Sequence, residues 1–188
     1  ATDRKQKEKF KHEIDDLIHK LTNGKEAFDF EIYFSEVFHR KGGFNAVIGN
    51  PPYGFRQIHT DAAKIIFKER FASAHGSYEN YFLFYEASLR LLSKSGVHAF
   101  IAPVTWLTIP SAKSLRQFIL NRYSVREICW LSEEAFENAS VNTLISIIER
   151  VQPANTRIKI FEMLAQFPLK PKMEHEIPQK QFTKNDFY

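Results

Sequence analysis

The sequence predicts an α/β fold, in which helices connect the strands of a sheet and an antiparallel hairpin lies at the sheet edge. Two short apolar runs typical of buried strands, 44–49 and 97–102, flank a segment with helical spacing of its apolar residues, 80–93. Two further strand-like runs, 125–131 and 143–149, follow with a short loop between them and are expected to pair. The length of 188 residues, with 44% hydrophobic and 14% aromatic residues, suffices for one domain with a large core.

Charge and cysteine content exclude several functional classes. Lys and Arg number 26 against 22 Asp and Glu, and the resulting net charge of +4 permits an anionic partner without requiring one. Cys129 is the only cysteine, which excludes an internal disulfide and a cysteine-based zinc site and fits a reducing cytoplasm. The seven histidines show no metal-ligand spacing, so no metal is expected. No apolar run approaches the roughly 18 residues of a membrane span, so we expect a cytoplasmic protein outside the membrane.

The first segment, residues 1–27, is expected to be an amphipathic helix. Phe10, Ile14, Leu17 and Leu21 recur three or four positions apart among charges of both signs, and Asn23-Gly24 ends the pattern. Because the charges nearly cancel, we interpret them as a solvated helix face rather than as a nucleic-acid-binding arm.

The central elements alternate between strands and helices. The run 44–49 stops at two prolines, which cannot donate to a sheet ladder, so the following loop lies at the carboxyl end of a strand. A weaker helical pattern follows in 54–77 and ends in a turn. The helix in 80–93 is expected to end at Gly96 in a left-handed cap.

The remaining elements complete the expected sheet. Pro103 stops the strand 97–102, and Ser111 is the expected N-cap of a helix that carries Leu115, Phe118 and Ile119. After Val151 the chain contains four prolines and scattered lysines, so this tail is interpreted as a linker.

The tetrapeptide Asn50-Pro51-Pro52-Tyr53 is the candidate catalytic motif. It places a carboxamide acceptor, two residues with fixed φ and an aromatic ring at the carboxyl end of a strand, where open α/β sheets bind ligands. The side-chain oxygen of Asn50 and the carbonyl of Pro51 can each accept one hydrogen of a planar amine, while Tyr53 stacks on the attached heterocycle. Two acceptors localise the nitrogen lone pair and raise its nucleophilicity, so no strong general base is required.

Several stretches of the chain resemble the adenine-N6 DNA methyltransferases of type II restriction-modification systems, particularly the nuclease-fused, type IIG-like enzymes. The resemblance covers roughly residues 5 to 162 and is strongest in 28–38, 42–53, 81–92, 100–107 and 136–143. Ser35 replaces a proline that is common there and Phe30 replaces a tryptophan, and both substitutions change packing rather than chemistry.

The resemblance implies a Rossmann-like, S-adenosylmethionine-dependent domain that flips adenine out of double-stranded DNA. It assigns Asn50 and Pro51 to the adenine amino group, Tyr53 to stacking and Phe136 to a second contact with the flipped base. Phe136 is alternatively a core or hairpin-edge aromatic. Lys64, Lys68 and Arg70 are candidates for DNA backbone contacts, and His39-Arg40-Lys41 is either a phosphate contact or a solvated turn.

The cofactor-binding motifs of the resembled family are missing. No Gly-x-Gly occurs in the chain, so we expect residues 28–151 to be the carboxyl half of a catalytic domain that binds S-adenosylmethionine weakly and is inactive alone. Residues 152–188 are then a linker or the start of a target-recognition region. Two alternatives remain open, a methyltransferase acting on RNA or on a protein glutamine, and a non-catalytic DNA-binding scaffold.

Overall fold

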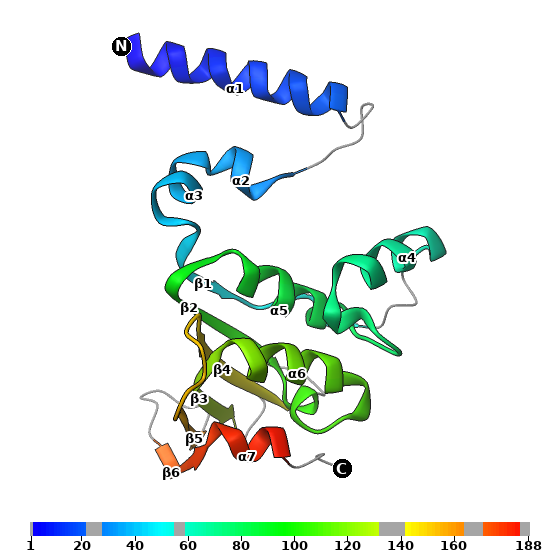
Figure 1. The fold of residues 1–188 in the computed structure, drawn as a ribbon, viewed down its shortest axis with the longest axis vertical. Coiled ribbons are helices and arrows are strands. Elements are labelled where there is room, and N and C mark those ends of the chain that lie inside the picture. The colour runs from blue at the N-terminus through cyan, green and yellow to red at the C-terminus, as the bar shows by residue number, and fades with distance from the viewer. Residues whose placement is uncertain (1, 22–27, 55–58, 132–141, 164–170, 185–188) are drawn as a thin grey trace. The chain divides into compact units, whose positions relative to one another are not determined.

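The computed structural model describes the chain except residues 1, 22–27, 55–58, 132–141, 164–170 and 185–188 (Figure 1). The chain divides into two compact units, Ala1–Arg40 and Lys41–Tyr188. No helix in the described ranges is both long enough and apolar enough to cross a membrane.

The first unit is helical. The expected amphipathic helix is confirmed as α1 (Thr2–Leu21), which precedes the short helix α2 (Phe30–Tyr33) and α3 (Ser35–Lys41). Asp29 caps α2, because its carboxylate accepts hydrogen bonds from the backbone N–H groups of Glu31 and Ile32 at 2.8 and 3.3 Å. The Tyr33 hydroxyl donates to Asp15 of α1 at 2.8 Å.

The second unit contains a six-stranded sheet with the strand order β1-β2-β4-β3-β5-β6. The strands are β1 (Phe44–Gly49), β2 (Leu92–Pro103), β3 (Ser124–Leu131), β4 (Thr143–Glu149), β5 (Arg157–Met163) and β6 (Pro171–Pro178). Strands β1 and β2 pair in parallel, as do β3 and β5, whereas β4 and β6 pair antiparallel to their neighbours. The carboxyl ends of β1, β2, β3 and β5 therefore lie at one edge of the sheet.

The α/β class is confirmed, but the position of the hairpin differs from the expectation. Strands β3 and β4 do pair antiparallel, yet β4 lies between β2 and β3 in the interior of the sheet. The antiparallel hairpin at the edge is β5–β6, within the tail that was expected to be a linker. Prolines were the reason for that expectation, but Pro171 and Pro178 stand at the two ends of β6, where they interrupt little of the ladder.

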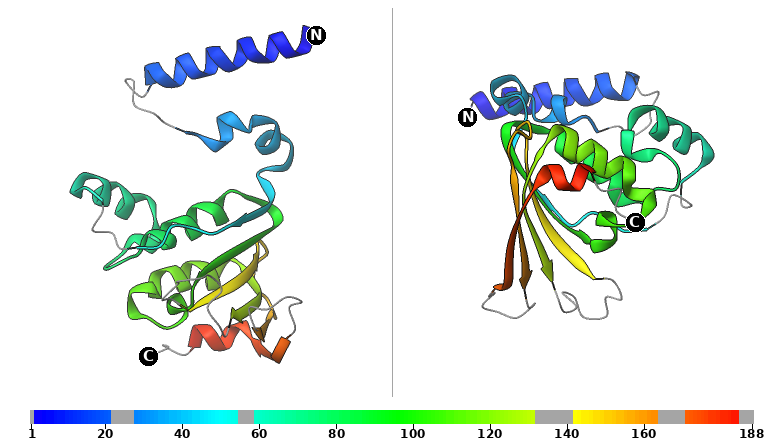
Figure 2. Two further views of the ribbon diagram at one scale, coloured as in Figure 1. Left: turned by 180° about the vertical axis from the view of Figure 1, so that it is seen from behind. Right: turned by 60° about the horizontal axis from the view of Figure 1, so that its bottom comes forward.

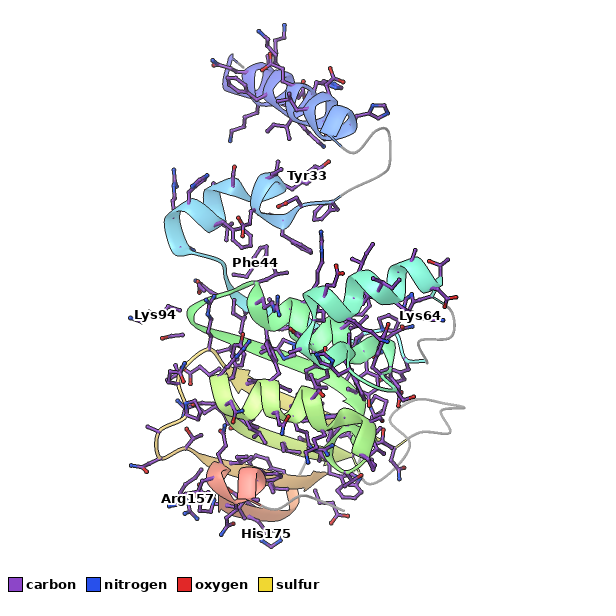
Figure 3. All side chains as sticks on the ribbon, turned by 45° about the vertical axis from the view of Figure 1, so that its right-hand side comes forward. Tyr33, Phe44, Lys64, Lys94, Arg157 and His175 are labelled. Carbon is purple, nitrogen blue, oxygen red and sulfur yellow. The ribbon has the colours of Figure 1, made fainter. Side chains whose placement is uncertain are left out.

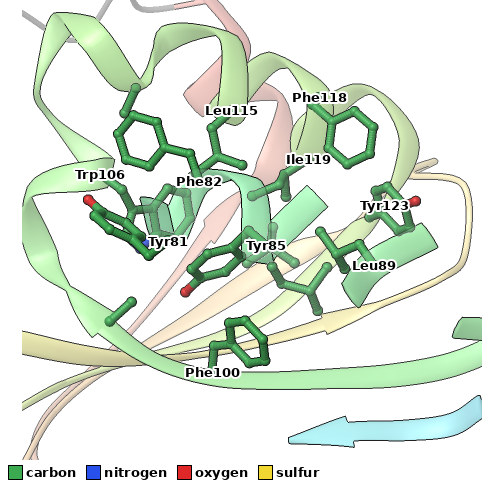
Figure 4. Packing of buried hydrophobic residues seen from close by; sticks show 14 of the residues in the cluster. Tyr81, Phe82, Tyr85, Leu89, Phe100, Trp106, Leu115, Phe118, Ile119 and Tyr123 are labelled. Atoms are coloured by element: carbon green, nitrogen blue, oxygen red, sulfur yellow. The ribbon is translucent and has the colours of Figure 1, made fainter. Parts of the chain in front are cut away.

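Helices cover one face of the sheet. In Figure 2, α5 (Asn80–Arg90), α6 (Lys113–Arg122) and α7 (Gln179–Lys184) all lie on the same side of it. Buried side chains alternate along β4, because Leu144, Ser146 and Ile148 face these helices. Between the sheet and the helices, aromatic residues of α5 pack against β2 and α6 (Figure 4).

Buried polar side chains fix the helices to their neighbours. The Gln179 amide donates to the carbonyls of Leu120 and Tyr123 and accepts from the N–H of Val125, which ties α7 to α6 and β3. Glu86 of α5 is completely buried. Its carboxylate accepts from the N–H groups of Ala72 and Ser73, in the turn Ala72–Ala74 after α4 (Asp61–Arg70), and pairs with Arg90.

Two expected helix boundaries are corrected. The helix α5 ends at Arg90 and β2 begins at Leu92, so Gly96 lies within a strand. Ser95 adopts the left-handed conformation, with φ of 63°, while a Cβ on Gly96 would lie 2.7 Å from the carbonyl oxygen of Phe44. Gly96 thus permits a close backbone approach rather than a helix cap. Ser111 does not cap α6, because a short turn, Pro110–Ala112, precedes that helix.

Candidate active site at the carboxyl end of β1

The tetrapeptide 50–53 directly follows β1, as expected, at the edge where the parallel strands end. Asn50 and Pro52 are exposed and Pro51 is buried. Neither the carboxamide of Asn50 nor the carbonyl of Pro51 is engaged by another residue in the described part of the chain. The Asn50 carboxamide is therefore exposed and can accept from a ligand, and the Pro51 carbonyl has no partner among the described residues.

Tyr53 is held from two sides. Its hydroxyl donates to the carbonyl of Ile101 on β2 at 3.4 Å, and its ring meets the ring of Tyr81 edge to face, with 6.1 Å between centroids. Tyr81 is fully buried and its hydroxyl lies 3.4 Å from Oγ1 of Thr105. Partial burial raises the pKa of Tyr53, so the ring that is available for stacking stays uncharged.

The segment after the tetrapeptide is joined to the start of α5. The N–H of Asn80 donates to the carbonyl of Gly54 at 2.8 Å, and Oδ1 of Asn80 lies 2.5 Å from Nε2 of His59. Gly54 has φ of 123°, a conformation that side chains disfavour. The loop thus has fixed points on both sides of residues 55–58.

A second loop at the same edge follows β2. Residues Val104–Leu107 form a short helical turn, in which Trp106 is 2% exposed. Arg116 of α6 donates from Nη1 to the carbonyls of Trp106 and Ile109, both at 2.8 Å. These contacts hold the turn that carries Thr105, whose hydroxyl meets that of Tyr81. Neither Thr105 nor Arg116 was singled out from the sequence.

Other predicted residues are less directly placed. Phe136 lies outside the described residues. Lys64 projects from α4 (Figure 3) and pairs with Asp61 at 3.0 Å, which lowers the pKa of that carboxyl group. Lys68 and Arg70 are exposed in the last turn of the same helix.

The described residues contain no group of three or more His, Cys, Asp or Glu that could hold a metal ion. Gly42-Gly43 is the only pair of adjacent glycines in the sequence. A Cβ on Gly43 would lie 2.5 Å from the carbonyl oxygen of Leu91, so this turn packs against its own chain rather than around a ligand.

Comparisons with known proteins show the fold and the family. The structure resembles a putative class I S-adenosylmethionine-dependent methyltransferase from Listeria monocytogenes, with a TM-score of 0.54 and 20% identity over 67% of this chain and 38% of that chain. The two proteins thus share an α/β fold. The model of the Eco57I restriction-modification methylase family matches residues 1–136, and the chain belongs to this family.

Two curated relatives support the assignment. The chain is 30% identical over 112 residues to the type II restriction enzyme and methyltransferase RM.Eco57I of Escherichia coli, covering 57% of this chain and 11% of that protein. It is 33% identical over 109 residues to the type II methyltransferase M.TthHB8I of Thermus thermophilus, covering 54% and 25%. The expected family is confirmed. The chain spans about a tenth to a quarter of the length of these two relatives.

Proposed function

We propose that the protein containing this chain is a DNA adenine-N6 methyltransferase of a restriction-modification system. Both relatives are named as type II methyltransferases, and one is also a restriction enzyme. The observation that carries the proposal is the pair of acceptors, Asn50 and Pro51, which no described residue engages, beside the supported ring of Tyr53. A flipped base with an exocyclic amino group fits such a pocket.

In this proposal the chain binds and activates the amino group. The Asn50 side-chain oxygen accepts one amino hydrogen and the Pro51 carbonyl accepts the other, so the nitrogen lone pair is drawn out of conjugation with the ring. Tyr53 stacks on the heterocycle and excludes water from its face. S-adenosylmethionine supplies the methyl group in this class of enzyme. Phe136 is proposed as a second contact with the base.

Substitution of Asn50 tests the function. In the whole natural protein that contains this chain, Asn50→Ala should lower methyl transfer by about 10² to 10³-fold, as the loss of one preorganised polar contact does in other enzymes. Because the Asn50 side chain is exposed and unengaged in the described part of the chain, the melting temperature should stay within about 2 °C. Asn45→Ala is the matched control. It removes the same type of side chain at the other end of β1, where Asn45 accepts a hydrogen bond from Ser93, and it should leave methyl transfer unchanged.

The product identifies the substrate. Digestion of methylated duplex DNA to nucleosides and mass spectrometry should show N6-methyladenine. Methylation of RNA or of protein glutamine in preference to duplex DNA would contradict the assignment of DNA. Near-normal turnover by Asn50→Ala would contradict the role of the tetrapeptide, and DNA binding without any methyl transfer would favour a non-catalytic scaffold.

A further inference from the structure

Asn80 contacts the loop behind the tetrapeptide at two points. Its backbone N–H donates to the carbonyl of Gly54 at 2.8 Å, and its side-chain Oδ1 accepts from Nε2 of His59 at 2.5 Å. Asn80 is 5% exposed. A carboxamide this deeply buried costs free energy unless it is hydrogen-bonded, so the bond to His59 is a structural requirement of the site.

The side chain of Asn80 is not used to cap its own helix. Asn80 is the first residue of α5 and Glu79 is the N-cap, which makes no side-chain capping bond. Asparagine caps a helix when it occupies the N-cap position, which here is Glu79, and Oδ1 of Asn80 is directed to His59. The Asn80 side chain therefore joins α5 to the loop that carries His59.

The contact lies next to the proposed base pocket. Gly54, which Asn80 holds, adjoins Tyr53, and Tyr81, which follows Asn80, lies edge-on against the Tyr53 ring. The Tyr53 hydroxyl has only a long bond of 3.4 Å to Ile101. The first turn of α5 thus supplies the short hydrogen bonds that restrain the loop.

The His59 side of the contact is also supported. The His59 ring meets the Phe67 ring of α4 edge to face, with 5.0 Å between centroids. His59 therefore joins α4, the loop and α5 through one ring. Loss of either side chain would break the link from the loop to α5 through His59, while the backbone bond from Asn80 to Gly54 would remain.

We propose that Asn80, acting through Gly54 and His59, is a positioning residue that holds the base-binding tetrapeptide in its active geometry. This inference rests on the proposed function. A displacement of about 1 Å at a reacting group lowers a rate by about 10²-fold, so the loop restraint has a measurable kinetic effect.

The test compares variants in the whole natural protein. Asn80→Ala should lower kcat by about 10²-fold while the Kd for duplex DNA changes by less than about threefold. Asn80→Asp keeps an oxygen acceptor for His59 and should recover most of kcat. His59→Ala removes the same hydrogen bond and also the ring contact with Phe67, so it should lower kcat at least as much, and the double variant should lose little more than His59→Ala alone. Asn45→Ala is again the matched control.

Amide hydrogen exchange provides a readout that does not depend on activity. Exchange at Tyr53, Gly54 and His59 should accelerate in Asn80→Ala and return toward the wild-type rate in Asn80→Asp. Unchanged exchange and unchanged kcat would overturn the inference. If Asn80→Ala does not fold, His59→Ala replaces it, because His59 is only half-buried. The same two measurements, kcat and hydrogen exchange, then test the inference. A wild-type protein that methylates no DNA would refute the proposed function instead, and the exchange comparison would still decide the role of Asn80.

Discussion

His98 offers a pH-dependent test of the core beneath the site. Its imidazole is fully buried in β2, and Nε2 lies 2.9 Å from the Ser88 hydroxyl. That hydroxyl already donates to the carbonyl of Phe84 at 2.6 Å, so Nε2 carries the hydrogen and donates to Ser88. Nδ1 has no hydrogen-bond partner in the described ranges. Protonation would place a second donor there without an acceptor, and burial lowers the pKa of His98 from 6.5 to about 3.

The sign of the effect follows from linkage. Below pH 6.5 the unfolded chain takes up a proton at His98 that the folded chain refuses until about pH 3, so the free energy of unfolding falls as the pH falls. At about 1.4 kcal/mol per pH unit, the loss between pH 7 and pH 5 is about 2 kcal/mol.

Urea unfolding at pH 7 and pH 5 measures this loss. His98→Gln does not titrate, and comparing the pH dependence of the two proteins cancels the packing change that the substitution itself produces. The variant should lose about 2 kcal/mol less than the wild type over this range. Equal pH dependence in the two proteins would refute the inference that the folded protein keeps the buried His98 imidazole neutral.

Two further substitutions test the frame that positions the site. Glu86→Gln removes a buried carboxylate that accepts from two backbone N–H groups, and it should lower the free energy of unfolding in urea by about 2 kcal/mol. Glu149→Gln removes one partner of a half-exposed ion pair and should lower it by less than about 1 kcal/mol. Gly43→Ala places a Cβ 2.5 Å from a backbone carbonyl at φ of 137° and should cost about 3 kcal/mol or more, against about 1 kcal/mol for Gly42→Ala, which meets no atom within 4 Å. Equal costs within either pair would contradict the assigned contacts.

The local elements around the candidate site were predictable from the sequence. The strand β1 has the expected bounds of 44–49 because an apolar-rich run ends shortly before two prolines, but its side chains are exposed or half-buried and not buried as expected. The strand β4 also has its expected bounds of 143–149. In both cases the signal is contained within a few adjacent residues, so no distant contact is needed to interpret it.

The arrangement of the strands and the support of the loop were not predictable in the same way. The place of β4 between β2 and β3 depends on pairings such as that of Phe100 with Ser146, which are distant in sequence. The alternation of polar and apolar residues in 157–160 is a strand signal, but the four prolines and scattered lysines of the tail led to the expectation of a linker. The role of Asn80 arises from two hydrogen bonds that no spacing encodes.

The binding of S-adenosylmethionine by this chain alone is the remaining prediction. Class I methyltransferases bind this cofactor, yet the sequence contains no Gly-x-Gly, and its one pair of adjacent glycines packs against Leu91 and Leu92. A nucleoside cofactor needs backbone amides in a tight glycine turn and an acceptor for its ribose hydroxyls. We therefore expect a Kd weaker than about 1 mM, a binding free energy smaller than about 4 kcal/mol. In isothermal titration of the isolated chain, micromolar binding at one site per chain would contradict this expectation and would place a cofactor pocket among residues that lack the glycine turn.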